Sequence, residues 1–243
     1  MSVFIHETAE VSADASIGEG TSVWHQAQIR ERARIGAECT VGKGVYIDFD
    51  VLIGNRCKLQ NGVYVYHGAT LEDGVFLGPG VMLLNDKNPR AINTDGSLKK
   101  DADWKVYPVH IGRGSAVGGG AVISPGVSLG CWASVGAGSV VTRNVPDHGL
   151  VYGNPARLAG YVCACGARMP MDADCRFVVA PRCSRCDVEV PAKLRTPASS
   201  ASSPGGLSEV QIPGVGDSDR EAIDENAALR RASFSTSPGR LAP

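Results

Sequence analysis

Two pairs of cysteines with the spacing of a metal site lie in the last third of the chain. Cys163 and Cys165 belong to the run CACG, and Cys183 and Cys186 belong to the run CSRC. Thiolates from two such short turns can hold a structural zinc ion, which can fold a segment too small for its own core. We expect structural zinc on these four cysteines and no catalytic role for it, because four thiolates leave no open position. Cys175 is a fifth candidate ligand, and reduced, unliganded cysteines are the alternative.

His67 and Asn85 are the first candidates for catalysis. An imidazole can remove a proton from a nucleophile, and an Asn amide can orient an amine or a carbonyl. Asn85 opens the segment 85–110, the one long interruption of a repeating pattern. A long loop costs backbone ordering without adding core, so it more often serves function than structure. A solvated corner histidine and a turn asparagine remain the alternatives.

The elements that position these residues follow from a six-residue period. One aliphatic side chain recurs at every sixth position, at Ile5, Val11, Ile17, Val23, Ile29, Ile35, Val41, Ile47, Ile53, Leu59, Val65, Leu71, Leu77 and Leu83, and again at Ile111, Val117, Ile123, Leu129, Val135 and Val141. A small residue or Val stands four positions after each of them except Leu83, which is followed by the long loop. An α-helix cannot keep a period of six on one face, and a plain strand alternates with period two. The pattern therefore predicts a coil of short strands and corners, with the frequent glycines at the turns, often with positive φ.

Composition and charge exclude several classes of partner. The net charge is −1, from 24 basic and 25 acidic residues, so no field favours nucleic acid or an anionic membrane surface. The start of the chain lacks the pattern of a secretory signal, and no apolar run approaches the length of a membrane span. We expect a cytoplasmic protein, in which metal is a better explanation for clustered cysteines than disulfides.

The repeat resembles that of the hexapeptide-repeat acyltransferases, whose fold is a left-handed parallel β-helix with three hexads per coil. Several segments resemble one branch, the N-acetyltransferases of nucleotide-linked 3-amino sugars such as UDP-2-acetamido-3-amino-2,3-dideoxyglucuronate. They are residues 23–25 (VWH), 58–66 (KLQNGVYVY), 71–79 (LEDGVFLGP), 85–90 (NDKNPR) and 153–157 (GNPAR). The resemblance covers residues 1–160.

The resemblance implies an acetyl-CoA-dependent N-acetyltransferase that acts on a UDP- or dTDP-linked amino sugar. It also implies a homotrimer with active sites between subunits. Glycines of the later coils, among them Gly112, Gly118, Gly120 and Gly136, would let the pantetheine arm approach the backbone, and Arg157 would meet a CoA phosphate. Simple turn formation is the alternative for each glycine.

With eighteen residues in a coil, His67 stacks directly beneath Asn85, whereas His25 lies on a different edge and reaches Asn85 only across a subunit interface. We predict that Asn85 orients the reactants and that His67 or His25 assists proton removal. An amine of modest pKa needs no protein base, so this role stays open. Arg90, Lys87 and Trp24 are the predicted substrate contacts.

Other functions stay open beside this one. His110 at the end of the loop is an alternative base. An O-acetyltransferase acting on a sugar or on serine is the other enzyme class, and a non-catalytic hexapeptide scaffold is the alternative outside the enzymes. A zinc carbonic anhydrase on the same coil needs three metal-binding histidines, and the sequence has no close pair of the required kind.

The sequence predicts three regions. Residues 1–160 form the left-handed β-helix domain with the loop 85–110. Residues 161–192 form a cysteine-rich module like a zinc ribbon. The rest, 193–243, is rich in Ser, Pro, Ala and Gly and is expected to be disordered.

Overall fold

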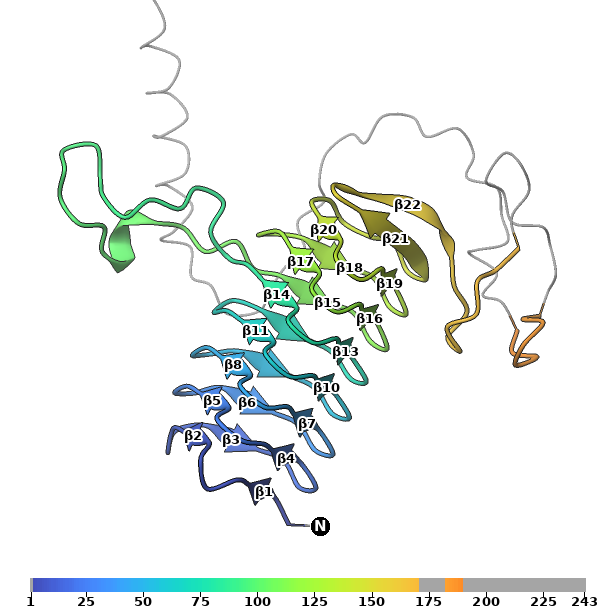
Figure 1. Cartoon of the computed structure of the whole chain (residues 1–243), viewed down its shortest axis with the longest axis horizontal. Coiled ribbons are helices and arrows are strands. Elements are labelled where there is room, and N and C mark those ends of the chain that lie inside the picture. The colour runs from blue at the N-terminus through green and yellow to red at the C-terminus, as the bar shows by residue number, and fades with distance from the viewer. Residues whose placement is uncertain (1, 171–181, 190–243) are drawn as a thin grey trace, which may run out of the picture. The chain divides into compact units, whose positions relative to one another are not determined.

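The structure, a computed structural model, describes residues 2–170 and 182–189, which fold into an all-β parallel solenoid (Figure 1). Short strands pass through three sheets in rotation, so that every third strand of the coil joins the same sheet. The architecture matches the left-handed β-helix expected from the repeat. The predictions for Cys175 and for the tail 193–243 lie outside the described residues.

Three sheets form the faces of the coil. Sheet A contains β1 (Phe4–Ile5), β4 (Ser22–Val23), β7 (Thr40–Val41), β10 (Lys58–Leu59), β13 (Phe76–Leu77), β16 (Ala116–Val117), β19 (Ser134–Val135), β21 (Gly149–Gly153) and β22 (Ala156–Tyr161). Sheet B contains β2 (Glu10–Val11), β5 (Gln28–Ile29), β8 (Tyr46–Ile47), β11 (Tyr64–Val65), β14 (Met82–Leu83), β17 (Val122–Ile123) and β20 (Val140–Val141). Sheet C contains β3 (Ser16–Ile17), β6 (Arg34–Ile35), β9 (Leu52–Ile53), β12 (Thr70–Leu71), β15 (His110–Ile111) and β18 (Ser128–Leu129). We call the turns between them the A/B, B/C and C/A corners.

The strand register confirms a coil of eighteen residues. Phe4 pairs with Ser22 and Ile5 with Val23, and the same parallel offset recurs in all three sheets until the insertion. The long loop leaves the B/C corner after β14 and contains η1 (Asp101–Asp103), the only helix among the described residues. The loop does not disturb the stack, because Thr70 on one side of it still pairs with His110 on the other.

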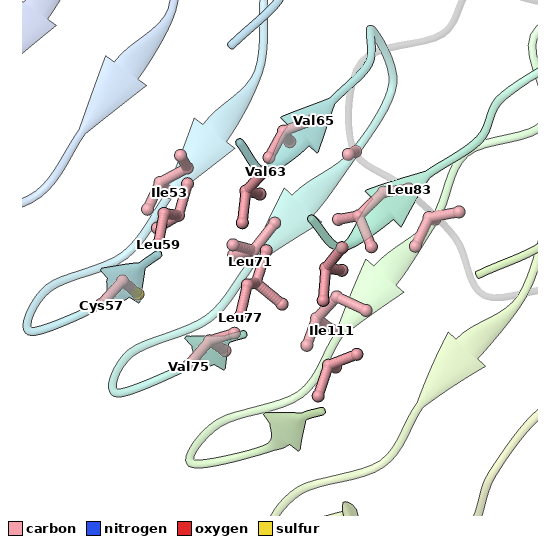
Figure 2. Close-up of a cluster of buried hydrophobic side chains, with 14 of the residues drawn as sticks. Ile53, Cys57, Leu59, Val63, Val65, Leu71, Val75, Leu77, Leu83 and Ile111 are labelled. Carbon is pink, nitrogen blue, oxygen red and sulfur yellow. The ribbon is translucent and has the colours of Figure 1, made fainter. Parts of the chain in front are cut away.

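The core is a column of aliphatic side chains inside the coil (Figure 2). The second residue of nearly every strand points inward, and the smaller residue four positions later packs beside it. From Val23 onward these residues are almost fully buried, with Leu59, Leu71 and Leu77 at most 2% exposed. Burying one such side chain stabilises the fold by about 1.5 to 3 kcal/mol. The six-residue period therefore reflects a core that is one side chain deep and continuous along the axis.

The glycines of the corners belong to two kinds, and only one of them has positive φ. The third residue after most of the aliphatic positions is left-handed, whether it is glycine, as at Gly120 with φ +67°, or another residue, as at Trp132 with φ +59°. Glycines that directly follow the aliphatic residue, such as Gly78 and Gly118, do not have positive φ. A Cβ on Gly118 would lie 2.4 Å from the backbone N of Ala137 in the next coil. For these glycines the expectation of positive φ was wrong, since the close approach of the next coil requires them.

An antiparallel hairpin ends the solenoid. β21 continues sheet A by pairing with β19, and β22 folds back on β21. The hairpin is fixed to the last coil by His148, which is buried, since its backbone O accepts from Val162 N at 2.8 Å and its ring Nδ1 donates to Val162 O at 2.9 Å. Across the described residues, no helix has the length and hydropathy needed to span a bilayer.

Candidate functional site

The B/C corners stack Phe49, His67 and Asn85 in one column, as the period predicts. The imidazole of His67 lies flat on the ring of Phe49, with centroids 4.0 Å apart and an interplanar angle of 16°. Its Nδ1 is 3.0 Å from the backbone O of Phe49. A carbonyl oxygen only accepts hydrogen bonds, so Nδ1 carries the proton and, in the neutral ring, Nε2 carries the lone pair. This geometry gives His67 the tautomer of a base that acts through Nε2.

Asn85 sits one coil above His67 and is held by it. Its Nδ2 donates to the backbone O of His67 at 3.1 Å, and its own backbone O accepts from Tyr107 N at 2.8 Å, where the loop returns. Because Nδ2 is the donor, the orientation of the amide is fixed, and Oδ1 is the atom left to accept a hydrogen bond from a ligand. The structure thus brings His67 and Asn85 together at the base of the long loop.

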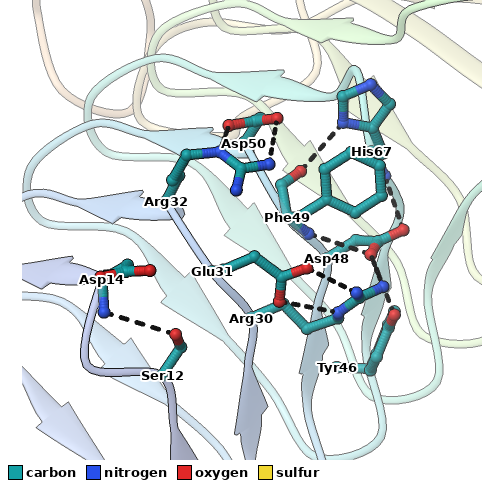
Figure 3. A network of polar contacts seen from close by, with 10 residues as sticks. All are labelled: Ser12, Asp14, Arg30, Glu31, Arg32, Tyr46, Asp48, Phe49, Asp50 and His67. Carbon is teal, nitrogen blue, oxygen red and sulfur yellow. Dashed lines mark hydrogen bonds and ion pairs between the residues drawn. The ribbon is translucent and has the colours of Figure 1, made fainter.

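A polar network lies beneath His67 (Figure 3). Asp48 is buried, at 7% exposed, and its carboxylate accepts from the Arg30 guanidinium, the Tyr46 hydroxyl and the backbone N of both Phe49 and His67. The sequence analysis missed this residue, because a carboxylate directly after a strand normally belongs to a solvated corner. Its place between two aromatic residues, Tyr46 and Phe49, was the available signal.

Charged groups surround the same corner on its N-terminal side. Arg32 donates two hydrogen bonds to Asp50, at 2.8 and 3.0 Å, and these hold the pKa of Asp50 below its ordinary value. The guanidinium carbons of Arg30 and Arg32 lie 5.1 and 5.9 Å from the centroid of the Phe49 ring. The side chains below His67 are therefore joined by hydrogen bonds and by contacts of the two guanidinium groups with the Phe49 ring.

The predicted substrate contacts in the loop lie at its start. Lys87 has its ammonium 4.4 Å from the ring centroid of Tyr107, so it packs across the base of the loop. Arg90 is exposed and donates to the backbone O of Pro89 at 2.8 Å. Both residues are exposed, and their role toward a ligand stays a prediction.

His25 and Trp24 lie at an A/B corner, away from the column of His67. The ring of His25 stacks on His6 at a centroid distance of 3.5 Å and on Trp24 at 6.2 Å. Trp24 also contacts Phe4 at 5.5 Å and is 42% exposed. In the part of the chain that the structure covers, no recorded contact joins His25 to His67. The structure thus places His25 at a different corner from His67, as predicted, and its approach to the site from another subunit stays a prediction.

The glycines predicted to bind the cofactor are packed against the coil above. A Cβ on Gly112 would meet Cys131 N at 2.7 Å, and one on Gly136 would meet Tyr152 Cβ at 2.7 Å, as Gly118 meets Ala137. Gly120 is different, since nothing lies within 4 Å of the place where its Cβ would be. Stacking alone explains the first three, and their contact with CoA stays a prediction. Arg157 is on β22, where its guanidinium contacts the backbone O of Ala156 at 3.1 Å.

His110, the alternative base, belongs to a different group. It lies on the outer face of sheet C, where its Nε2 is 3.1 Å from Glu72 Oε1. The other oxygen of Glu72 accepts from Arg113 N at 2.8 Å. None of the recorded contacts of His110 involves the column of His67, so the structure does not bring the two histidines together.

The four predicted zinc ligands do converge. The sulfur atoms of Cys163, Cys165, Cys183 and Cys186 all lie within 4.8 Å of one another, with Cys163 to Cys186 at 3.6 Å and Cys165 to Cys183 at 3.8 Å. Four sulfurs at about 2.3 Å from a tetrahedral zinc ion would be roughly 3.8 Å apart. Backbone N–H groups of Cys186 and Arg185 lower the pKa of Cys183 to about 6, whereas burial raises the pKa of Cys163 to about 12. The donor set and its spacing fit zinc.

Comparison with known families agrees with the repeat. A model described as bacterial transferase hexapeptide (six repeats) matches residues 50–85, and one described as hexapeptide repeat of succinyl-transferase matches residues 32–67 and 108–143. Among solved structures, a UDP-N-acetylglucosamine acyltransferase from Bacteroides fragilis has a TM-score of 0.54 at 16% identity, over 66% of this chain and 61% of that one. This likeness supports the fold.

Two curated relatives show similarity over shorter stretches. A dTDP-3-amino-3,6-dideoxy-alpha-D-galactopyranose 3-N-acetyltransferase from Aneurinibacillus thermoaerophilus is 53% identical over 57 residues, which are 24% of this chain and 30% of the relative. A serine acetyltransferase from Buchnera aphidicola is 32% identical over 115 residues, 47% of this chain and 40% of the relative. The chain thus spans less than half the length of either relative. Its coils and the matched repeat models agree with a hexapeptide repeat, and both of these relatives are acetyltransferases.

Proposed function

We propose that the protein is an acetyl-CoA-dependent N-acetyltransferase that acts on the amino group of a UDP- or dTDP-linked amino sugar. The observation that carries the proposal is the pair formed by His67 and Asn85 at the base of the loop. His67 has a free Nε2 for a proton, and Asn85 has a free Oδ1 for an N–H group. The 53% identity to a dTDP-3-amino-sugar N-acetyltransferase over 57 residues supports an amine as the acceptor.

The reaction needs positioning and one proton transfer. The amine nitrogen attacks the thioester carbonyl carbon, the C–N bond forms and the C–S bond breaks. Asn85 Oδ1 accepts an N–H of the amine and directs its lone pair toward the carbonyl. His67 Nε2 takes the proton that the nitrogen loses and gives it to the departing thiolate, so that the products are an amide and CoA thiol. No covalent enzyme intermediate is required.

The substrates occupy the surface around this corner. Acetyl-CoA lies along the later coils, with a phosphate near Arg157 on the terminal hairpin, and the glycines Gly112, Gly118 and Gly136 keep the backbone there close-packed. The nucleotide sugar meets Arg90 and Lys87 of the loop, and Trp24 from another subunit. Guanidinium and ammonium groups suit the diphosphate of the sugar nucleotide.

A thiol-release assay tests the activity. Purified protein is incubated with acetyl-CoA and with a matched panel of acceptors, namely UDP- and dTDP-linked 3-amino sugars, the corresponding hydroxyl sugars, and serine. We expect CoA release with the amino sugars, abolished with the hydroxyl sugars. Turnover of serine or of a hydroxyl sugar instead would establish the O-acetyltransferase alternative, which the similarity to serine acetyltransferase favours. The absence of turnover with every acceptor would leave the scaffold function.

We infer that the chain acts as a homotrimer with its sites between subunits. The outer face of sheet B presents Tyr46, Tyr64, Met82, Val122 and Val140 in one row, a continuous apolar and aromatic strip that suits a subunit interface. A trimer also brings His25 and Trp24 of one subunit toward the loop of the next. Sedimentation velocity measures the assembly, and a monomer at micromolar concentration that retains full turnover would contradict it.

We further propose that Cys163, Cys165, Cys183 and Cys186 hold a structural zinc ion. The support is the convergence of four sulfurs at tetrahedral spacing and the short chain segment around them, which has a core of only a few side chains. Metal analysis of purified protein should give one zinc per chain. Replacing Cys165 and Cys186 by Ser should remove it, and a stoichiometry near zero in the unaltered chain would reject the site.

A further inference from the structure

We propose that Asp48 is the positioning residue of His67, because its buried carboxylate binds the backbone of His67 and of Phe49 at once. This inference rests on the proposed function, since it gives a role to the base of that reaction. Asp48 does not touch the imidazole. It acts through the two backbone segments between which the imidazole is held.

The carboxylate of Asp48 is fully engaged. Oδ1 accepts from Arg30 Nη1 at 3.0 Å, from the Tyr46 hydroxyl at 3.0 Å and from Phe49 N at 2.9 Å, and Oδ2 accepts from His67 N at 3.1 Å. Its side chain is 10% exposed. A charge removed from water is costly unless it is paired and hydrogen-bonded, so four donors on one carboxylate indicate a site with little freedom.

The two backbone contacts determine where the imidazole sits. Phe49 N is bound by one oxygen of Asp48 and His67 N by the other, so the carboxylate sets the spacing of the two coils at this corner. The carbonyl of Phe49 then meets His67 Nδ1 at 3.0 Å, and the phenyl ring supports the imidazole at 4.0 Å. Figure 3 shows the carboxylate on one side of this arrangement and the imidazole on the other. Nε2 is the ring atom that remains for the substrate.

Some corners are joined by backbone hydrogen bonds alone, so stacking by itself does not need such a carboxylate. At one A/B corner Gly44 N donates to His25 O at 3.0 Å, and at another Gly80 N donates to Asn61 O at 3.0 Å. One other carboxylate offers a direct comparison. Asp73, at a C/A corner, accepts from Asn55 N of the neighbouring coil at 2.7 Å, and it contacts no histidine.

The test compares Asp48→Asn with Asp73→Asn. Each change replaces one carboxylate oxygen by an NH₂ group. At position 48 this group must face donors whichever way the amide turns, either His67 N or the set formed by Arg30, Tyr46 and Phe49. At position 73 the amide can keep its oxygen toward Asn55, because Asn55 N and Nδ2 both donate to Oδ1, and the NH₂ group then takes the place of Oδ2 at a C/A corner. A merely structural role predicts similar behaviour for the two variants.

The primary measurement is the tautomer of His67 by long-range ¹H–¹⁵N correlation of the imidazole, at about pH 8.5, where an ordinary imidazole is neutral. The resonances are assigned with His67→Gln. We expect the Nδ1–H form in the unaltered protein and in Asp73→Asn, and a mixture with the Nε2–H form in Asp48→Asn. An unchanged tautomer in Asp48→Asn would overturn the proposal, whether or not any substrate is turned over.

The kinetic measurement uses the acetyl acceptor found in the thiol-release assay. Asp48→Asn should lower kcat by roughly tenfold or more, since a displacement on the order of 1 Å at a reacting group is costly, and leave KM for acetyl-CoA within about twofold. Asp73→Asn should leave both unchanged. Equal effects of the two variants on kcat would contradict positioning. If the proposed function is wrong, the result is different: no variant turns over the acceptor, but Asp48→Asn still shifts the tautomer of His67.

A milder variant covers the case in which Asp48→Asn does not fold. Tyr46→Phe removes one of the four donors and keeps the carboxylate. It should shift the tautomer in the same direction by a smaller amount. No shift in a folded Tyr46→Phe protein, beside an unfolded Asp48→Asn protein, would assign Asp48 to stability alone.

Discussion

Alanine substitution at Gly118 and at Gly120 separates coil stacking from turn conformation and from cofactor contact. The two glycines share one A/B corner. A Cβ on Gly118 would lie 2.4 Å from Ala137 N and 2.8 Å from Ala137 Cα, whereas ordinary contacts begin near 3.4 Å. The next coil must therefore move by about 1 Å, which resembles overpacking at roughly 1 to 3 kcal/mol. The hydrogen bond from Gly118 N to Val135 O, 2.8 Å long, is weakened as well, by roughly 1 kcal/mol.

Gly120 carries a different penalty. Its φ is +67°, and no atom would contact the added methyl group. An L-residue in the left-handed region costs about 1 to 2 kcal/mol. The chain already accepts this at Arg56 and Trp132, which have φ of +56° and +59° at equivalent corner positions. We expect Gly118→Ala to lower the free energy of unfolding by about 3 kcal/mol and Gly120→Ala by about 1 kcal/mol.

Urea unfolding followed by far-UV circular dichroism measures the difference as a shift in midpoint at unchanged slope. Equal destabilisation by the two variants would refute the stacking explanation. A Gly118→Ala protein of unaltered stability, with a raised KM for acetyl-CoA, would refute it too and would assign Gly118 to the cofactor instead. Steady-state kinetics on the same preparations distinguish these outcomes.

Three further predictions use the site, the charges and the cysteines. Asn85→Ala should reduce kcat by about 100-fold in the thiol-release assay, a scale typical of a lost positioning contact. Asn93→Ala, in the same loop, should leave kcat unchanged. Equal losses in the two variants would mean that the order of the loop matters rather than the Asn85 amide. Arg32 lowers the pKa of Asp50, and backbone N–H of Asn55 lowers that of Asp73, so both carboxylates stabilise the fold above their ordinary pKa of 3.8 and lose this contribution as the pH falls below it. Tm should drop from pH 5 to pH 3, and less so in an Asp50→Asn, Asp73→Asn variant; a parallel drop in both would contradict the assignment. A zinc chelator should expose the four clustered cysteines, Cys163, Cys165, Cys183 and Cys186, to alkylation. Cys39 and Cys57, at most 2% exposed, should stay protected. Mass spectrometry of tryptic peptides measures the alkylation, and alkylation of the four cysteines before chelation would show that no metal is bound.

The fold could be predicted because the repeat depends on one simple constraint. Each inward side chain touches its own coil and the two neighbouring coils, so a residue such as Leu77 is specified by position modulo six alone. The same arithmetic placed His67 under Asn85, and His25 at another corner. The convergence of the four cysteines followed from motif spacing, since short thiolate turns have few ways to meet.

Other features could not be predicted because they depend on side-chain geometry between coils. The role of Gly118 needs the distance to Ala137, which no pattern along the chain supplies. Asp48 is close to Arg30 and His67 only after the coils stack, and an acidic residue at a corner is otherwise common on solvated surfaces. The tautomer of His67 likewise depends on which carbonyl lies beneath it.

Before the long loop, paired strands are offset by eighteen residues in all three sheets, so each coil adds a constant length to the solenoid. Neighbouring coils are about 4.8 Å apart, so distance along the axis is counted in whole turns. Removing one turn, such as residues 36–53, would bring the stacked aromatic residues at Trp24 closer to the loop by one such step while leaving both groups internally intact. Duplication or deletion of a coil therefore changes the distance between these two groups in steps of one coil, and with it the length of a ligand that can contact both.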